Sequence, residues 1–158
     1  MVPNYAELHR LSNFTFLRGA SHPEELVETA HQLGYHALAL TDECSLAGAV
    51  RAHIAAKDRN LKLILGSEFT LQSEVGSDPR ARKRSEEASP PTRLIVLSTD
   101  RTGYGNLSVL ITRARRQAAK GDYRLMRDDV TGNLAGCLVI LLPPVHALRG
   151  TRLNHQAR

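Results

Sequence analysis

Polar and apolar residues alternate at the start of the chain and then give way to helical spacing. Residues 5–10 alternate, which is typical of a strand with one buried face. From Ser21 onward the spacing becomes helical, with Ser21 as the expected N-cap, Glu24 completing a capping box and Gly34 ending the helix. The chain is therefore predicted to open with a strand and then a helix. The apolar stripe expected to be buried on this helix consists of Leu26, Val27, Ala30 and Leu33.

The same two periodicities continue along the chain and predict further strands and helices. Apolar runs typical of strands occupy residues 35–42, 61–71, 93–98 and 137–142. Helical spacing occupies residues 46–57, with Leu46, Val50, His53 and Ile54 on one face, and residues 104–119, with Leu107, Leu110, Ile111 and Ala114 inward. Gly66 is expected at a bulge or bend, Gly121 at a helix cap, and Asp128 and Asp129 in a short helical turn. This order predicts an α/β fold with a predominantly parallel sheet.

Two segments fall outside this pattern. Residues 72–92 are rich in Ser, Gly, Asp, Pro, Arg, Lys and Glu, which predicts a mobile surface loop inserted between strands. Residues 145–158 have little apolar periodicity and are expected to form a disordered tail. The remainder, residues 1–144, is long enough for one domain with a core, and the chain is 42% apolar, as globular proteins are.

Cysteine content and motifs narrow the classes of function. Cys44 and Cys137 lack the spacing of a metal or redox motif, which favours reduced thiols in a cytosolic protein. The sequence has no glycine-rich nucleotide-binding fingerprint and no nucleophile motif of the G-x-S-x-G type. The N-terminus has no signal-peptide features, and the longest apolar run, residues 138–142, is too short to cross a bilayer. We therefore expect a cytoplasmic protein without a membrane partner.

Positive charge exceeds negative charge, and the formal net charge is +5. One basic cluster lies within residues 80–84, and a second consists of Arg113, Arg115, Arg116 and Lys120. Such clusters attract phosphate backbones, although short charge runs are more often solvated surface. The first cluster is expected to be a solvated loop, and the second is a candidate nucleic-acid contact.

Groups able to bind a metal stand at the ends of three predicted strands. They are His9, the adjacent pair Asp42 and Glu43, and Glu68. Imidazole and carboxylate groups bind zinc, manganese or iron in sites that hydrolyse phosphoesters. A lone histidine at a strand end is more often a hydrogen-bonded structural residue, and Asp42 suits a helix cap or a turn equally well. The residue types alone leave both interpretations open.

Four stretches, in order, closely resemble a known module: residues 5–21, 39–48, 63–69 and 94–107. The module is the N-terminal polymerase-and-histidinol-phosphatase (PHP) domain of bacterial family C DNA polymerases. The similarity is closest to the error-prone, translesion branch of the polymerase III alpha-subunit family, and it covers about residues 4–144. The resemblance implies a distorted TIM-like barrel with flanking helices and a metal cluster at the strand ends. About five barrel strands are present, so the barrel is expected to be incomplete and to leave an unpaired sheet edge.

The resemblance also implies that the metal site is degenerate. The residues at retained or altered ligand positions are His9, Asp42, Glu43 and Glu68, and the ligands are lost at Leu11, Arg18 and Arg93. Leucine has no lone pair to donate, and arginine is a permanent cation that repels a metal. We hypothesise that Arg18 and Arg93 pair with Glu43 or Glu68 in place of the metal. No cofactor is expected, and zinc or manganese would be one only if the degenerate site still binds a divalent metal.

The function implied is that of a non-catalytic PHP-domain fragment of an error-prone DNA polymerase, which supports the polymerase core in DNA replication and damage-induced translesion repair synthesis. Its expected partners, through the parent polymerase, are DNA and other translesion and replication proteins, and no small-molecule substrate is expected. The sequence lacks the polymerase palm, so a truncated gene product or a fragment is expected. Two alternatives stay open: a metal-dependent phosphoesterase or 3′–5′ exonuclease, and a stand-alone basic nucleic-acid-binding module.

Overall fold

A computed structural model describes residues 5–72, 91–132 and 134–142. Most of the predicted insertion loop, the basic cluster within it and the predicted tail lie outside the described residues. The strands are β1 (Ala6–Arg10), β2 (Ala37–Leu40), β3 (Lys62–Thr70), β4 (Arg93–Ser98) and β5 (Cys137–Leu142). The helices are α1 (Pro23–Gln32), α2 (Ala49–Arg59), α4 (Arg101–Arg116) and α5 (Arg127–Val130). Each predicted strand and helix is therefore present, with ends that differ from the prediction by a few residues.

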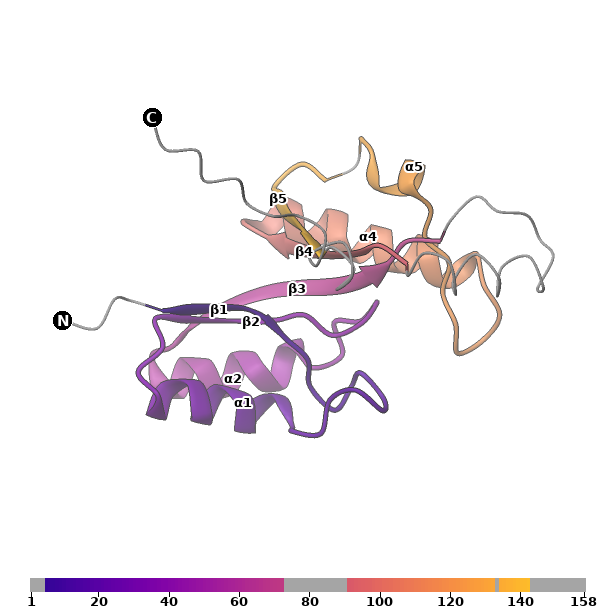
Figure 1. Ribbon diagram of the computed structural model, residues 1–158. Helices are drawn as coiled ribbons and strands as arrows, with labels where there is room; N and C mark the ends of the chain where they lie inside the picture. The colour runs from indigo at the N-terminus through magenta and orange to yellow at the C-terminus, as the bar shows by residue number, and fades with distance from the viewer. Residues whose placement is uncertain (1–4, 73–90, 133, 143–158) are drawn as a thin grey trace, which may run out of the picture.

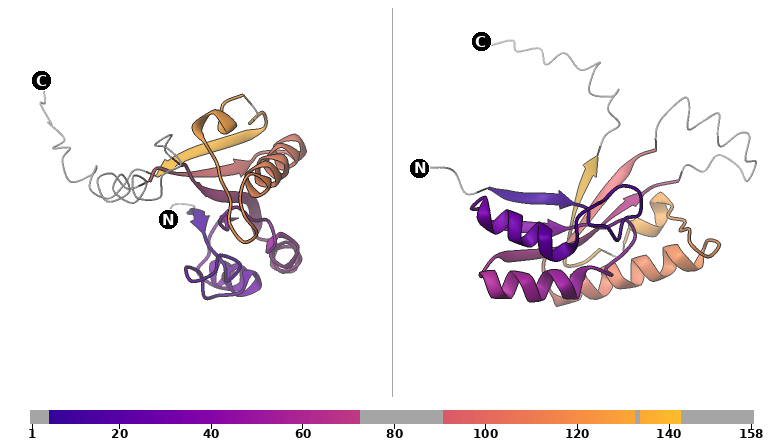
Figure 2. Two further views of the ribbon diagram at one scale, coloured as in Figure 1. Left: turned by 90° about the vertical axis from the view of Figure 1, so that its right-hand side faces the viewer. Right: turned by 90° about the horizontal axis from the view of Figure 1, so that it is seen from below.

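The five strands form one curled sheet in the order β1–β2–β3–β4–β5, with helices beside it (Figures 1 and 2). β1, β2 and β3 are parallel neighbours, whereas β4 is antiparallel to both β3 and β5. Four of the five strands therefore run in one direction, as predicted, but the reversed β4 corrects the expectation of a simple parallel βα alternation. A short buried apolar run looks the same in either direction, so local sequence does not encode the reversal.

Strand β3 joins the two parts of the sheet because each of its halves pairs with a different neighbour. Its first half pairs with β2 through Leu65, and its second half pairs with β4 from Gly66 onward. The register is continuous at Gly66, so the predicted bulge is absent there. The glycine is needed for close approach instead, because a Cβ atom at this position would lie 2.6 Å from Leu97 Cδ2 and 2.7 Å from the Val96 carbonyl oxygen.

Helix α1 packs as predicted over most of its length but begins one residue later. Its N-cap is His22, whose backbone N–H donates to the Glu25 carboxylate at 2.8 Å, so these residues take the places predicted for Ser21 and Glu24. Leu33, predicted to be inward, is 62% exposed. The rest of the predicted stripe, Leu26, Val27 and Ala30, is buried.

Helix α2 buries a different face from the one that hydrophobicity predicts. Val50 and Ile54 are 69% and 57% exposed. The buried residues of this helix are Ala49, Ala52 and Ala56. Alanines allow α1 and α2 to approach closely, and Gly48 at the N-cap lies tightly against Pro23 for the same reason. Helix contact here is decided by small side chains, which a search for large apolar residues overlooks.

Helix α4 packs on β4 through the predicted residues and starts earlier than predicted. Asp100 is its N-cap, and its carboxylate accepts the Gly103 backbone N–H at 2.8 Å. The helix ends at the C-cap Gln117, so Gly121 lies beyond it and is not the predicted cap. Leu107, Leu110 and Ala114 are buried as predicted. No helix among the described residues is long and apolar enough to cross a membrane.

Apolar side chains form three clusters on the two faces of the sheet. One lies between α1, α2 and β2, and a second lies between α4 and the strands β3 and β4. The third joins Ala39, Ile95 and Leu97 with side chains of β3 and β5 on the opposite face of the sheet. Within the described residues β1 and β5 end the sheet, as predicted for an incomplete barrel, and Leu8 and Leu138 there are 39% and 61% exposed.

We predict that Gly66→Ala lowers the free energy of unfolding by about 1–3 kcal/mol, because the new methyl group overpacks the contact between β3 and β4. The matched control is Gly105→Ala within α4, where an added Cβ meets nothing within 4 Å. That variant is expected to be neutral or to stabilise by up to about 1 kcal/mol. Urea unfolding of the two variants checks the difference, and equal stabilities would contradict the proposed close approach.

Candidate functional site

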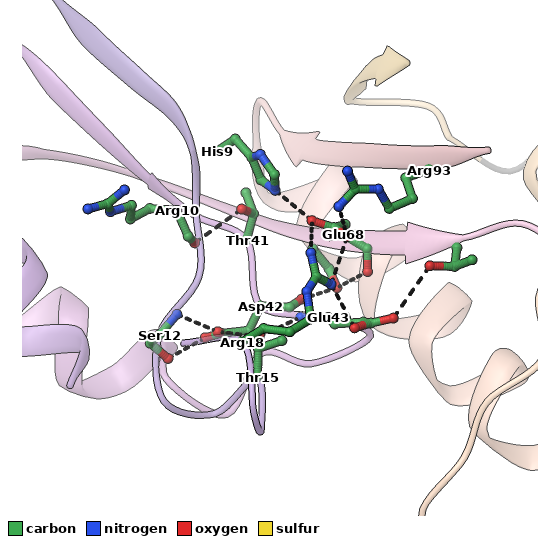
Figure 3. Close-up of polar contacts among 12 residues, drawn as sticks. His9, Arg10, Ser12, Thr15, Arg18, Thr41, Asp42, Glu43, Glu68 and Arg93 are labelled. Carbon is green, nitrogen blue, oxygen red and sulfur yellow. Dashed lines mark hydrogen bonds and ion pairs between the residues drawn. The ribbon is translucent and has the colours of Figure 1, made fainter. Parts of the chain in front are cut away.

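The predicted strand-end residues meet at one edge of the parallel part of the sheet (Figure 3). His9 comes from β1, Glu43 follows β2, and Glu68 comes from the second half of β3. The segment after β2 runs beside β3, and Glu43 forms a parallel bridge with Glu68. In β1 the register shifts between Glu7 and Arg10, the stretch that carries His9. The sheet therefore brings together residues that are far apart in the sequence.

The centre of the site is the carboxylate of Glu68, whose side chain is 0% exposed. His9 Nε2 lies 2.6 Å from Glu68 Oε2. Arg18 contacts both carboxylate oxygens, with Nη1 2.9 Å from Oε1 and Nη2 3.1 Å from Oε2. Arg93 Nη1 lies 3.3 Å from Oε1. The hypothesis that Arg18 and Arg93 pair with an acidic residue of this site is confirmed.

Charge compensation sets the ionisation of this buried carboxyl group. Burial by itself raises the pKa of Glu68. The hydrogen bonds from His9 and Arg18, together with the charges of Arg18 and Arg93, outweigh that effect and bring the pKa down to about 2. Glu68 is therefore ionised at neutral pH, and its charge is met by guanidinium groups.

Arg18 also links Glu68 to the second acidic residue of the site. Its Nη1 donates to Glu43 Oε2 at 2.8 Å. The other Glu43 oxygen accepts the Tyr123 hydroxyl at 2.7 Å, and that hydroxyl oxygen accepts the Thr70 backbone N–H at 2.8 Å. Burial, and then the hydrogen bond to Glu43, raise the pKa of Tyr123. The phenol therefore stays protonated and donates a hydrogen bond to Glu43.

Asp42 is buried and holds the loop between β1 and α1. Its carboxylate accepts the backbone N–H and the hydroxyl of Ser12, each at 2.7 Å, and the Thr15 hydroxyl at 2.7 Å. Thr15 in turn accepts the Glu43 backbone N–H at 3.0 Å. Asp42 therefore positions the loop that delivers Arg18 to Glu68.

Three residues of this network were absent from the sequence-based site. Ser12 and Thr15 could have been suspected, because hydroxyl residues in the loop after a strand are placed to bond a neighbouring strand end. Tyr123 could not, because it lies 80 residues from Glu43 and nothing in its local sequence indicates the contact.

The oxygen and nitrogen atoms of the site do not fit a divalent cation. A metal needs several free lone pairs directed at one point. Here the Glu68 oxygens face two arginines and a histidine, and the Asp42 oxygens face N–H and O–H donors. Leu11 is half-buried and has no lone pair to donate. Within the described ranges, no group of three or more His, Cys, Asp or Glu residues is arranged to hold a metal ion.

The four basic residues predicted to contact nucleic acid lie in two different environments. Arg115 donates from Nη2 and Nε to the Cys44 carbonyl oxygen at 3.1 and 3.3 Å, and its guanidinium lies 5.5 Å from the centroid of the Tyr123 ring. Arg113, Arg116 and Lys120 are exposed at the end of α4 and just beyond it. Arg115 therefore contacts the loop after β2, whereas the other three face solvent.

Comparisons with known proteins agree with this fold. The PHP domain family matches residues 7–145. An error-prone DNA polymerase of Ralstonia nicotianae is 54% identical in an alignment of 151 positions, which covers 90% of this chain and 13% of that relative. An error-prone DNA polymerase of Bordetella parapertussis is 52% identical over 100% of this chain and 15% of its own length. The chain thus spans about a seventh of the length of these relatives.

A solved structure shares the fold at lower sequence similarity. It is a protein of Bifidobacterium adolescentis assigned as a metal-dependent phosphoesterase, with a TM-score of 0.52 and 24% identity. The match covers 72% of this chain and 34% of that one. At this identity the likeness describes the fold.

We predict that acid destabilises the protein through Glu68. The folded pKa of Glu68 is about 2, against an ordinary value of 4.5, so its ionisation stabilises the fold above pH 4.5 and this contribution is lost as pH falls toward 2. In urea unfolding, the stability lost by Glu68→Gln should be largest near neutral pH and should shrink between those two pH values. Asp58→Asn, at an exposed position of α2, is the control. A stability difference that does not change with pH would contradict this assignment.

We also predict that Arg18→Met destabilises the protein by about 1–3 kcal/mol, because Glu68 keeps its buried charge and loses the guanidinium that contacts both of its oxygens. The control is Arg59→Met, which breaks the exposed ion pair with Glu28 and should cost no more than about 0.5 kcal/mol. Adding Glu68→Gln to Arg18→Met should recover part of the loss. Chemical unfolding of Arg18→Met, Glu68→Gln and the double variant measures the coupling between the two residues, and additive effects of the two substitutions would argue against that coupling.

Proposed function

The chain belongs to the PHP domain family, and from that premise we propose that it is the PHP module of an error-prone DNA polymerase, built as a support for the polymerase and not as a metal-dependent hydrolase. The relatives that match nearly all of the chain are error-prone DNA polymerases at 52–54% identity, and the matched part is a small fraction of their length. The observation that carries the non-hydrolytic part of the proposal is the contact of Arg18 with both oxygens of Glu68.

The arginines hold the ends of these strands together, as a bound metal ion would. A cation tied to two carboxylates holds neighbouring strand ends together, and Arg18 does so for Glu43 and Glu68. It cannot make a nucleophile, because a guanidinium group binds no water with a lowered pKa. His9 is engaged with Glu68 in the same cluster. The site therefore stabilises the module without preparing a hydrolytic reaction.

In this proposal the wider setting of the module is that of its relatives. It serves DNA replication and damage-induced translesion repair synthesis in the cytoplasm, together with DNA and the other proteins of that process. Of the four basic residues at the end of α4 and just beyond it, Arg113, Arg116 and Lys120 face solvent and are available to a phosphate backbone. Arg115 is less suited to that role, because its guanidinium holds the Cys44 carbonyl.

We expect the purified protein to contain well under one equivalent of zinc, manganese or iron by elemental analysis, because the donor atoms that would bind a metal are paired with protein donors. Dialysis against a chelator should leave its unfolding midpoint unchanged. A stoichiometric metal whose removal lowers that midpoint would contradict the proposal.

A direct assay distinguishes the proposed support function from the competing enzymatic hypothesis. Hydrolysis of a phosphodiester substrate is measured with added manganese, with His9→Ala as the diagnostic variant and His53→Ala, an exposed histidine on α2, as its control. Manganese-dependent hydrolysis that is lost in His9→Ala and kept in His53→Ala would establish a phosphoesterase or exonuclease instead.

A further inference from the structure

The loop of residues 12–19 between β1 and α1 is held firmly at its base. Asp42 binds Ser12 and Thr15, and the Asn13 backbone N–H donates to the Ser21 carbonyl at 2.8 Å. The Arg18 and Gly19 N–H groups both donate to the Thr15 carbonyl, at 3.1 and 3.0 Å. The loop therefore has a defined shape before any partner arrives.

Its base is also closely packed. A Cβ atom at Gly19 would lie 1.9 Å from the Ser12 carbonyl oxygen, so the two ends of the loop touch through backbone atoms. The loop projects from the carboxyl ends of the parallel strands, beside α1 and beyond the edge of the sheet (Figures 1 and 3). The segment is a short, compact loop whose ends are in contact, and not an extended surface segment.

The tip of this firm loop presents large apolar side chains to solvent. Phe16 is 83% exposed, Leu17 is 89% exposed and Phe14 is 41% exposed. Phe14 and Phe16 are two of the three phenylalanines in the chain, and the third, Phe69, is fully buried. Leu17 has φ +64°, in the left-handed region that is unfavourable for a leucine. The loop thus holds apolar side chains away from its own core, with the backbone of Leu17 in an unfavourable conformation.

We propose that Phe14, Phe16 and Leu17 form a docking tip that inserts into an apolar groove of the polymerase body, the part of the protein that lies outside the matched segment in the longer relatives. This inference rests on the proposed function. Those relatives extend well beyond this chain, which spans 13–15% of their length, so a large protein surface is available to face the tip. Exposed aromatic residues on a rigid support are typical anchors of protein–protein contacts.

The charge around the tip favours a protein groove over nucleic acid. Arg18 is the single charged residue between positions 11 and 21, and its guanidinium is paired with Glu43 and Glu68. Single-stranded nucleic acid needs free cations for its phosphates beside any aromatic surface for its bases. The loop offers the aromatic surface without such a cation, which suits an uncharged, apolar partner.

The experiment compares this chain alone with a chimaera in which it replaces the matching N-terminal segment of the Ralstonia nicotianae polymerase. Hydrogen exchange is measured for the amides of residues 13–19 in both proteins. Docking should slow their exchange in the chimaera on the order of tenfold relative to the isolated chain. The double variant Phe16→Ser/Leu17→Gly should return that exchange to the isolated rate and lower the temperature at which the chimaera loses its activity.

The same substitutions have the opposite consequence in the isolated chain. There the side chains contact solvent, and glycine accepts the positive φ of position 17, so the unfolding midpoint should stay the same or rise. The matched control is Leu33→Ser/Val50→Ser, which removes two similarly exposed apolar side chains from α1 and α2. It should leave the exchange of residues 13–19 unchanged in both proteins.

Exchange that is equally fast in the chimaera and in the isolated chain would overturn the docking inference, even if the chimaera extends a primer normally. Protection that appears only when single-stranded DNA is added would also overturn it, in favour of nucleic-acid binding. Protection that is lost in Phe16→Ser/Leu17→Gly supports it. Failure of the chimaera to extend a primer, with protection intact, would instead count against the proposed polymerase function and leave the docking contact standing.

Discussion

The burial of the Glu68 carboxylate is the constraint on which the rest of the site depends. An ionised carboxyl group removed from water is costly unless charges and hydrogen bonds replace its hydration. Arg18, Arg93 and His9 all converge on it, from a loop and two different strands. Because Arg18 must reach Glu68, the loop after β1 has to be held in one shape, and Asp42 provides that hold through its two hydroxyl partners.

The same network joins the two parts of the sheet. Glu43 follows β2, in the parallel part, and its partner Tyr123 lies between α4 and α5, in the part built on β4. Tyr123 also binds the backbone of Thr70 at the end of β3. A chain of polar contacts therefore runs from β1 to the region after α4 while the apolar clusters hold the helices. Partly satisfied polar networks are costly, so these residues are expected to act as a unit.

The protein's own charged groups thus hold the strand ends of this fold together. At the strand ends Arg18 meets the Glu68 carboxylate, whereas neutral N–H and O–H donors meet the Asp42 carboxylate. The strand ends remain tied together, and the exposed tip at Phe16 and Leu17 stands on the loop that the same contacts hold. The contacts at the strand ends in this way also shape a surface.

The sequence determined the element order, the boundaries of β4 and β5 and the approximate place of the other elements, because hydrophobic period and capping are local properties of a few neighbouring residues. It also indicated that Arg18 would pair with an acidic residue, since an arginine among carboxylates has few other stable arrangements. Only the tertiary structure decided the direction of β4, the alanine face of α2 and the contact of Tyr123 with Glu43. Each of these depends on which surfaces meet across long separations in the chain, and side-chain size and backbone direction at such contacts leave no periodic signal in the sequence.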